Sequence, residues 1–358
     1  MRRRVFWAAL LLLAVSVAGG LAGCSSVGYL AQSVGGHLSL MNAARPVQDW
    51  IADPKTAAPL RERLQLAARM RDFSVSELHL PDNNSYRRYA DLRRGAAVWN
   101  VVAAPELSLK LRTACFPVVG CVGYRGYFDR AAADKEAAAL RAQADEAYVY
   151  GVPAYSTLGW TNWFGGDPLL STFIGYPEGE LARMIFHELA HQVAYAKDDT
   201  MFNESFATAV ETIGGRRWLQ QRAGATAREE YERFDGRRRD FRGLTRAYRD
   251  RLDALYKSSL PDADKRLRKA ELMQQMRAEY ARVKAERWGG YAGYDNWFER
   301  ANNASLGVLS AYDELVPQFL QLFEREGQDF PRFYAEVKRL ARLPKDERRA
   351  TLGAFSSP

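Results

Sequence analysis

Residues 186–211 read FHELAHQVAYAKDDTMFNESFATAVE. The chain has four histidines, and two of them, His187 and His191, lie four residues apart, with Glu188 directly after the first. Apolar residues recur at helical spacing here, so both imidazoles fall on one helix face, about 6 Å apart, where they could hold one ion. Zinc binds neutral imidazole, and a catalytic zinc has three protein ligands and an open position for water. Glu188 could then take a proton from that water.

The third ligand is expected on a second helix that faces the first. Asn203 is a good N-cap, and the helix that it predicts would stop at Gly214 and Gly215. Glu204 falls in the first turn of this helix, and Glu211 follows seven residues later on the same face. The alternative to a metal site is a pair of histidines buried in a helical bundle.

The segments HELAHQ and NESFATAVE resemble the gluzincin metallopeptidases, in particular the alanyl-aminopeptidase family, whose pattern is HELAHQ, then NEGFA and a further Glu. The resemblance implies that His187, His191 and Glu204 bind Zn²⁺. It also implies that Glu188 is the general base and that Glu211 supports the ligand residues without binding the ion itself.

The spacing departs from that family at one point. Twelve residues separate His191 from Glu204, fewer than in the alanyl-aminopeptidases. The nineteen residues between His191 and Glu211 match a thermolysin-like spacing, so Glu211 is the rival ligand. We favour Glu204 because it carries the preceding Asn and the following Phe-Ala, and a shortened surface connection is easily tolerated.

Peptide-bond hydrolysis also needs a hydrogen-bond donor for the developing oxyanion. Tyr155, in an expected strand before the histidine helix, and Tyr312, in a later helix, are the candidates, although either could be a packed core tyrosine. An extended peptide substrate could pair with the edge of that strand. The chain has no Gly-Ala-Met-Glu-Asn run to bind a substrate amine. Glu178 or Glu180 could substitute, or could complement the helix dipole, so exo- and endopeptidase modes both stay open.

The N-terminus reads MRRRVFWAALLLLAVSVAGGLAGC, with three arginines, an apolar run and small residues before Cys24. This order is typical of a secretory signal, and LAGC resembles the bacterial lipobox. We therefore expect a lipoprotein signal peptide over residues 1–23, acylation of Cys24 and a lipidated lead-in over 24–54; the alternative is an ordinary signal peptide. Ser25 after the cysteine resembles the sorting signal for the outer membrane, which predicts a lipid-anchored protein facing the periplasm.

The remaining cysteines, Cys115 and Cys121, are expected to form a small disulfide-closed loop, because an envelope compartment is oxidising. Their spacing fits no common zinc-thiolate site. Without residues 1–23, which hold three arginines and no acid, the formal charge falls from +8 to +5. This mild excess suits an anionic envelope surface and does not indicate a nucleic-acid partner.

The remaining patterns predict an α+β fold that is predominantly helical. Apolar spacing indicates helices over 59–78 and 129–146 and a long helical hairpin over about 225–287. Strands are expected over 86–92 and 96–104, paired with each other, and from 147 into a loop. These elements form a single zincin-like metallopeptidase domain over 55–358, with a small β-sheet.

A broader resemblance covers nearly the whole chain. The lipobox, CFPVVGCVGYRGYF, AYSTLGW…DPLLST, HELAHQ, NESFAT and NNASL…Y…VP are similar to the bacterial predicted-aminopeptidase lipoproteins. That resemblance implies a zinc-dependent envelope peptidase acting on peptides. The alternative is a non-catalytic zinc-containing lipoprotein that binds a partner, in which an acid such as Asp198 or Asp199 closes the metal site. The arginine-rich hairpin could also dock on peptidoglycan or anionic lipid. The sequence does not predict the oligomeric state.

Overall fold

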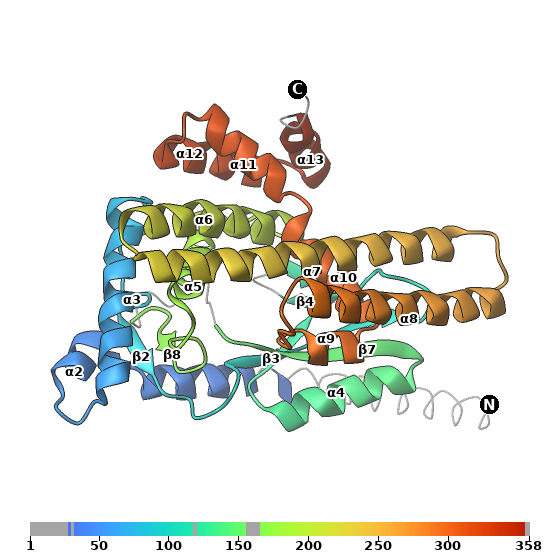
Figure 1. Ribbon diagram of the computed structural model, residues 1–358, viewed down its shortest axis with the longest axis horizontal. Helices are drawn as coiled ribbons and strands as arrows, with labels where there is room; N and C mark the ends of the chain where they lie inside the picture. Colours follow the sequence, from blue (N-terminus) through green and yellow to red (C-terminus); the bar gives the residue numbers. More distant parts are fainter. Residues whose placement is uncertain (1–27, 30–31, 117–119, 155–164, 355–358) are drawn as a thin grey trace, which may run out of the picture.

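The computed structural model describes residues 28–29, 32–116, 120–154 and 165–354 (Figure 1). Cys24 lies outside these residues, so the lipobox and its acylation stay predictions. The described part is mostly helical, with short strands in small sheets, which confirms the predicted α+β, predominantly helical class. Within that part, every helix is too short or too polar to cross a bilayer.

The stretch 186–211 lies on two helices that pack along each other, α5 (Glu178–Ala190) and α6 (Thr200–Gln221). The predicted start of α6 at Asn203 is wrong. The helix begins one turn earlier, and the side chain of Asp199 is its N-cap. Asn203 therefore lies inside the first turn, where its side chain bonds to the loop before the helix instead of capping it.

The predicted stop at Gly214 and Gly215 is also wrong, since both glycines lie inside α6. A Cβ at Gly214 would lie 2.6 Å from Leu78 Cδ1 and 2.9 Å from Phe186 Cδ2, and one at Gly215 would lie 2.9 Å from Arg183 Cγ. The two glycines therefore allow close packing of neighbouring elements, which outweighs their low helix propensity.

The largest strands form an antiparallel sheet in which β3 (Val98–Pro105) lies between β6 (Arg125–Tyr127) and β7 (Asp145–Val152). Its side chains alternate between two faces, as the period of a strand requires. One face packs on α4 (Arg130–Ala142) and the other on α10 (Asn303–Asp313). The residues toward α4 include Val101, Ala103, Ala147 and Val149, and those toward α10 include Val102, Ala104 and Tyr148.

Two smaller sheets complete the β-structure. In one, β2 (Arg88–Ala90) lies between β1 (Arg45–Pro46) and β8 (Leu169–Leu170). The other is the hairpin of β4 (Ala114–Phe116) and β5 (Gly120–Val122). The predicted pairing of strands 86–92 and 96–104 is wrong, because β2 and β3 belong to different sheets. Local alternation indicates a strand but does not choose its partner.

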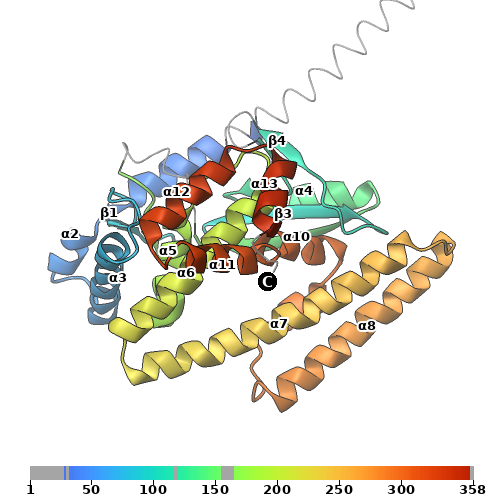
Figure 2. The same cartoon turned by 90° about the horizontal axis from the view of Figure 1, so that it is seen from above.

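The predicted helical hairpin corresponds to α7 (Ala225–Lys257) and α8 (Asp262–Glu286). Figure 1 and Figure 2 show the two helices side by side, extending beyond the end of α6. Its apolar seam joins the aromatic residues of α9 (Asp295–Arg300) and the preceding turn in a separate core. Members of this core include Phe241, Tyr248, Leu252, Tyr280, Trp288 and Phe298.

The main core surrounds α5 and α6. On one side lies α3 (Ala58–Ser76), close to the predicted helix 59–78, after the short α2 (Val47–Ala52). On the side of α6 away from the β3 sheet lie the C-terminal helices, as Figure 1 shows. These are α11 (Val316–Arg325), α12 (Phe330–Ala341) and α13 (Lys345–Gly353). The helices α5 and α6 are thus covered on several sides, which fixes their relative position.

Candidate metal centre

Three side chains from α5 and α6 meet at one point. His187 is in the last turn of α5 and His191 is its C-cap, so their rings lie one above the other. Glu204 reaches them from α6: its Oε2 lies 3.3 Å from His187 Nε2 and 3.7 Å from His191 Nε2. The two Nε2 atoms are 3.2 Å apart. Among the described residues, these three form the one group of His, Cys, Asp or Glu donors close enough to share an ion.

The distances between the donor atoms fit a tetrahedral zinc site. A tetrahedral ion with bonds of about 2.0–2.1 Å separates its ligand atoms by about 3.3–3.4 Å. The three observed separations are 3.2, 3.3 and 3.7 Å. Two imidazole nitrogens and one carboxylate oxygen are also donors that zinc accepts, and three of them leave one position for water.

Glu211 lies on the other side of the His187 ring. Its Oε2 is 3.0 Å from His187 Nδ1, and its Oε1 forms an ion pair with Arg183. The side chains of Arg183 and Glu211 are only 7% and 12% exposed. Burial raises the pKa of Glu211, but Arg183 and His187 together outweigh this effect and lower that pKa to about 2. Glu211 therefore stays ionised and accepts a hydrogen bond from the Nδ1–H group of His187. This bond leaves Nε2 of His187 on the side of Glu204.

Glu188 is half-buried and directly follows His187 on α5. Burial, opposed by the charge of His187 and reinforced by the carboxylates of Glu204 and Asp167, raises the pKa of Glu188 to about 7. Asp167 is fully buried and belongs to the loop before β8. A carboxylate with a raised pKa can both accept and release a proton near neutral pH, as a general base must.

The two histidines differ in their electrostatics. Burial alone would lower the pKa of His187, but its bonds to Glu204 and Glu211 raise that pKa well above the usual value. His191 has no such pair of carboxylates, and burial lowers its pKa to about 4. His191 is therefore neutral, as a metal ligand must be, and the carboxylates around His187 favour one positive charge at the meeting point.

The sequence model of one protein family matches residues 28–352 of the chain. The chain belongs to this family, described as "putative aminopeptidase". That description indicates a peptidase. No curated protein and no solved structure matches the chain significantly.

In this member of the "putative aminopeptidase" family, the side chains of both predicted oxyanion donors fall outside the described part of the structure. Tyr155 lies outside the described residues, and Tyr312 lies on α10 with a side chain that is not described. Two tyrosines that the sequence did not single out lie near Glu204. Burial, followed by the charge of Glu204, raises the pKa of both Tyr124 and Tyr195. Tyr195 follows His191 by four residues, a signal that the sequence did contain.

The acids considered for binding a substrate amine have other partners. Glu178 accepts a hydrogen bond of 2.9 Å from Trp218 Nε1, and Glu180 pairs with Arg238 Nη2 at 2.6 Å. Both lie in the first turn of α5, two or more turns before His187. Their observed contacts are therefore structural ones, at the end of α5 away from His187.

The acids considered as a fourth ligand are also engaged elsewhere. Asp199 caps α6 and pairs with Arg348 at 2.6 Å. Asp198 accepts from Cys121 N at 2.7 Å. The side chain of Gln192, next to His191, bonds to Ser85 Oγ at 3.1 Å. These contacts fix the chain around the three donors without adding another acid to them.

Proposed function

We propose that the protein is a zinc-dependent peptidase with a zincin-like core of the gluzincin type. His187, His191 and Glu204 hold the ion, Glu188 is the general base, and Glu211 orients His187. The observation that carries the proposal is the triangle of donor atoms, with sides of 3.2, 3.3 and 3.7 Å. The aminopeptidase family of the chain supports a peptidase reaction.

The chemistry divides between the ion and the protein. A bound zinc ion polarises the scissile carbonyl and lowers the pKa of a water molecule to ~7. Glu188 accepts a proton on its carboxylate from the attacking water and delivers it to the leaving amine. Glu211 keeps Nδ1 of His187 protonated, so that Nε2 stays free for the ion.

The oxyanion donor is proposed among the tyrosines near Glu204. Tyr124 and Tyr195 are both half-buried, and a raised pKa keeps both phenols protonated at neutral pH. A neutral phenol can donate to an oxyanion, which is the role that the sequence analysis gave to Tyr155 or Tyr312. We place Tyr124 and Tyr195 beside these two as candidates.

The substrate is proposed to be a peptide that binds in an extended form. The edge of β7 is the nearest described equivalent of the strand predicted for this role. Part of that edge is covered: Asn302 Nδ2 donates to Ala147 O and Arg300 Nη2 to Val149 O, each at 3.2 Å. An added peptide would therefore pair beyond Val149, toward residues 151–154. Exo- and endopeptidase modes predict different products and are separated by the experiment below.

The proposed peptidase is a lipoprotein of the bacterial envelope. The signal-like residues 1–23 and Cys24 support an N-terminal lipid anchor, and Ser25 supports an outer-membrane location facing the periplasm. The Cys115–Cys121 disulfide suits an oxidising compartment outside the cytoplasm.

The test compares metal content and hydrolysis in the chain purified from Ser25 onward. We expect about one zinc per chain in the parent protein and in Glu188→Gln, and loss of zinc in Glu204→Ala. Only the parent should cleave peptides. Free and N-acetylated forms of the same peptides, analysed by mass spectrometry, distinguish an aminopeptidase, which the acetyl group blocks, from an endopeptidase.

Three outcomes would change the conclusion. A parent protein without zinc after reconstitution refutes the metallopeptidase. Zinc retained in Glu204→Ala but lost in Glu211→Ala exchanges the roles of these two residues. Zinc bound in the parent without cleavage of any peptide favours the non-catalytic lipoprotein that acts as a binding module.

A further inference from the structure

The segment that joins the ligand helices is short and is fixed at several points. This connector, residues 192–199, leads from His191 to the start of α6 at Thr200, and Glu204 follows four residues later. The side chain of Asn203 donates to Ala196 O at 2.9 Å and accepts from Ala196 N at 2.8 Å. Any movement of this connector changes the distance between the two helices that carry the ligands.

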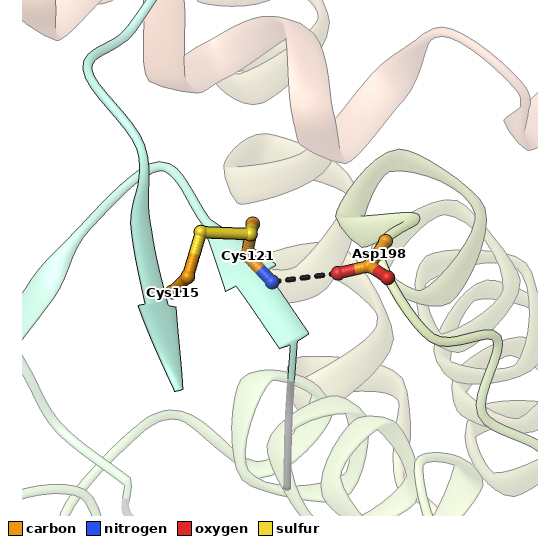
Figure 3. Close-up of a disulfide and its surroundings, with 3 residues drawn as sticks. All are labelled: Cys115, Cys121 and Asp198. Atoms are coloured by element: carbon orange, nitrogen blue, oxygen red, sulfur yellow. Dashed lines mark hydrogen bonds between the residues drawn. A yellow bond between two sulfur atoms is a disulfide. The ribbon is translucent and has the colours of Figure 1, made fainter. Parts of the chain in front are cut away.

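Other elements hold the connector at three residues. Gln192 bonds to Ser85, and Asp199 pairs with Arg348. Asp198 is held twice, because its carboxylate bonds to the β4–β5 hairpin and its carbonyl accepts from Lys345 Nζ at 3.4 Å. The backbone of Asp198 is in the left-handed region, with φ 60°, which Asp tolerates better than most residues. Its Oδ1 accepts a hydrogen bond of 2.7 Å from Cys121 N, as Figure 3 shows. The bond joins residues 77 positions apart in the chain. It is charge-assisted, so it is stronger than a bond between neutral groups.

The partner of Asp198 belongs to the hairpin β4–β5, which has little support of its own. Each strand has three residues, and within the described residues they pair only with each other. An isolated two-stranded hairpin is marginally stable in water. Cys115 and Cys121 face each other in its register and form a disulfide across it. The disulfide therefore fixes the position of the Cys121 N–H group.

The same hairpin leads directly to the metal centre. Tyr124 follows Cys121 by three residues, is half-buried, and lies near enough to Glu204 for that carboxylate to raise the pKa of its phenol. The hairpin thus contacts the connector through Asp198 and approaches the third ligand through Tyr124. Both half-cystines are exposed, so a small reductant can reach the disulfide.

We propose that the Cys115–Cys121 disulfide controls the metal centre through Asp198. In the oxidised protein the hairpin holds the connector, and Asp198 is a positioning residue for Glu204. A dithiol reductant breaks the S–S bond: the protein gains two thiols, and the dithiol gives up two electrons and two protons and becomes a disulfide. The hairpin then loosens, Asp198 loses its donor, and zinc is held less tightly. This regulation rests on the proposed metal site.

The test uses the full chain in detergent, oxidised or reduced with a dithiol. Hydrogen exchange of the amides of residues 192–199 is measured without metal, and zinc retention by competition with a chelator. In the oxidised parent we expect slow exchange; reduction should speed it and weaken zinc binding about 10-fold. Asp198→Gly, which suits the positive φ, should resemble the reduced parent and show no further response to the dithiol.

Two variants serve as controls. Asp198→Asn keeps an acceptor oxygen and tolerates the left-handed backbone, so it should keep the response to reduction. Asp129→Ala removes a carboxylate that accepts a backbone N–H at the same 2.7 Å, at the start of α4, and should leave the connector unchanged.

The two readouts separate this proposal from the metal site itself. Exchange in the connector that is equal before and after reduction overturns the control by the disulfide, whatever the zinc result. A response to the dithiol that persists in Asp198→Gly overturns the role of Asp198. Absence of zinc from every form refutes the metal site, while the exchange rates still decide whether the disulfide holds the connector.

Discussion

Replacing Glu211 with alanine tests how the buried charges support the proposed metal centre. The change removes the carboxylate between Arg183 and His187, whose Nδ1 lies 3.0 Å from Glu211 Oε2. Arg183 is 7% exposed, and removing one partner of a buried ion pair costs about 3–5 kcal/mol. Asp235 Oδ1, 3.9 Å from Arg183 Nη1, keeps part of the attraction, so we expect the lower end of this range, about 3 kcal/mol.

The same substitution should weaken zinc binding without abolishing it. His187 loses the acceptor that fixes its ring, and loss of such a partner typically lowers metal affinity about 10- to 100-fold. Urea unfolding of the metal-free protein gives the free energy of unfolding, and competition with a chelator gives the affinity. Glu299→Ala, an exposed change on α9, is the control and should stay within about 0.5 kcal/mol of the parent.

A second variant isolates the cost of the unpaired charge. Combining Glu211→Ala with Arg183→Met removes both charges and should recover part of the lost stability, but not the zinc affinity. An exposed ion pair contributes about 1 kcal/mol or less. A free energy of unfolding of Glu211→Ala alone that lies within about 1 kcal/mol of the parent would therefore refute the buried ion pair. Complete loss of zinc in Glu211→Ala, with zinc retained in Glu204→Ala, would show that Glu211 is the ligand.

Three further outcomes follow from packing and hydrogen bonding. Gly214→Ala places a Cβ 2.6 Å from Leu78 Cδ1 and should lower the free energy of unfolding in urea by about 1–3 kcal/mol. Gly243→Ala on α7 is the control: its Cβ meets open space, so the better helix propensity of alanine should raise that free energy by about 0.5–1 kcal/mol. Arg71 is fully buried and donates to three carbonyls of the loop 81–85, so Arg71→Met should cost about 3–5 kcal/mol by the same measurement. If Tyr124 or Tyr195 donates to the oxyanion, its Phe variant should lower kcat by about 10²–10³ at unchanged zinc content; equal kcat in both variants would exclude them.

The sequence predicts the helices that carry the proposed metal centre better than it predicts where those helices begin and end. His187 and His191 are four residues apart on a helix, and this local spacing alone brings their rings together. The sequence predicts the wrong start for α6 because Asn203 and Asp199 are both residues that commonly cap a helix. The choice between them depends on Arg348, which pairs with Asp199 from the far end of the chain. Such a contact leaves no local pattern.

The parts that could not be predicted depend on contacts between distant segments. The pairing of β2 with β8 joins residues 89 and 169, and the alternation within each strand carries no information on that choice. Tyr124 lies near Glu204, 80 residues later in the chain, and the nearby Cys121 contacts the connector through Asp198. In the same way, the sequence indicates that Gly214 ends a helix, whereas in the structure the missing side chain of Gly214 makes room for Leu78.

The short separation between His191 and Glu204 is compatible with the ligand role because helix geometry, not chain length, places the two glutamates. Glu204 and Glu211 are seven residues apart, about 10 Å along the axis of α6, and their carboxylates reach opposite nitrogens of His187, at 3.3 and 3.0 Å. Exchanging their roles would require α6 to slide by about two turns past α5. The cap at Asp199 and the bonds of Asn203 to Ala196 hold α6 against such a shift. The thermolysin-like count to Glu211 therefore does not outweigh the contacts of Glu204.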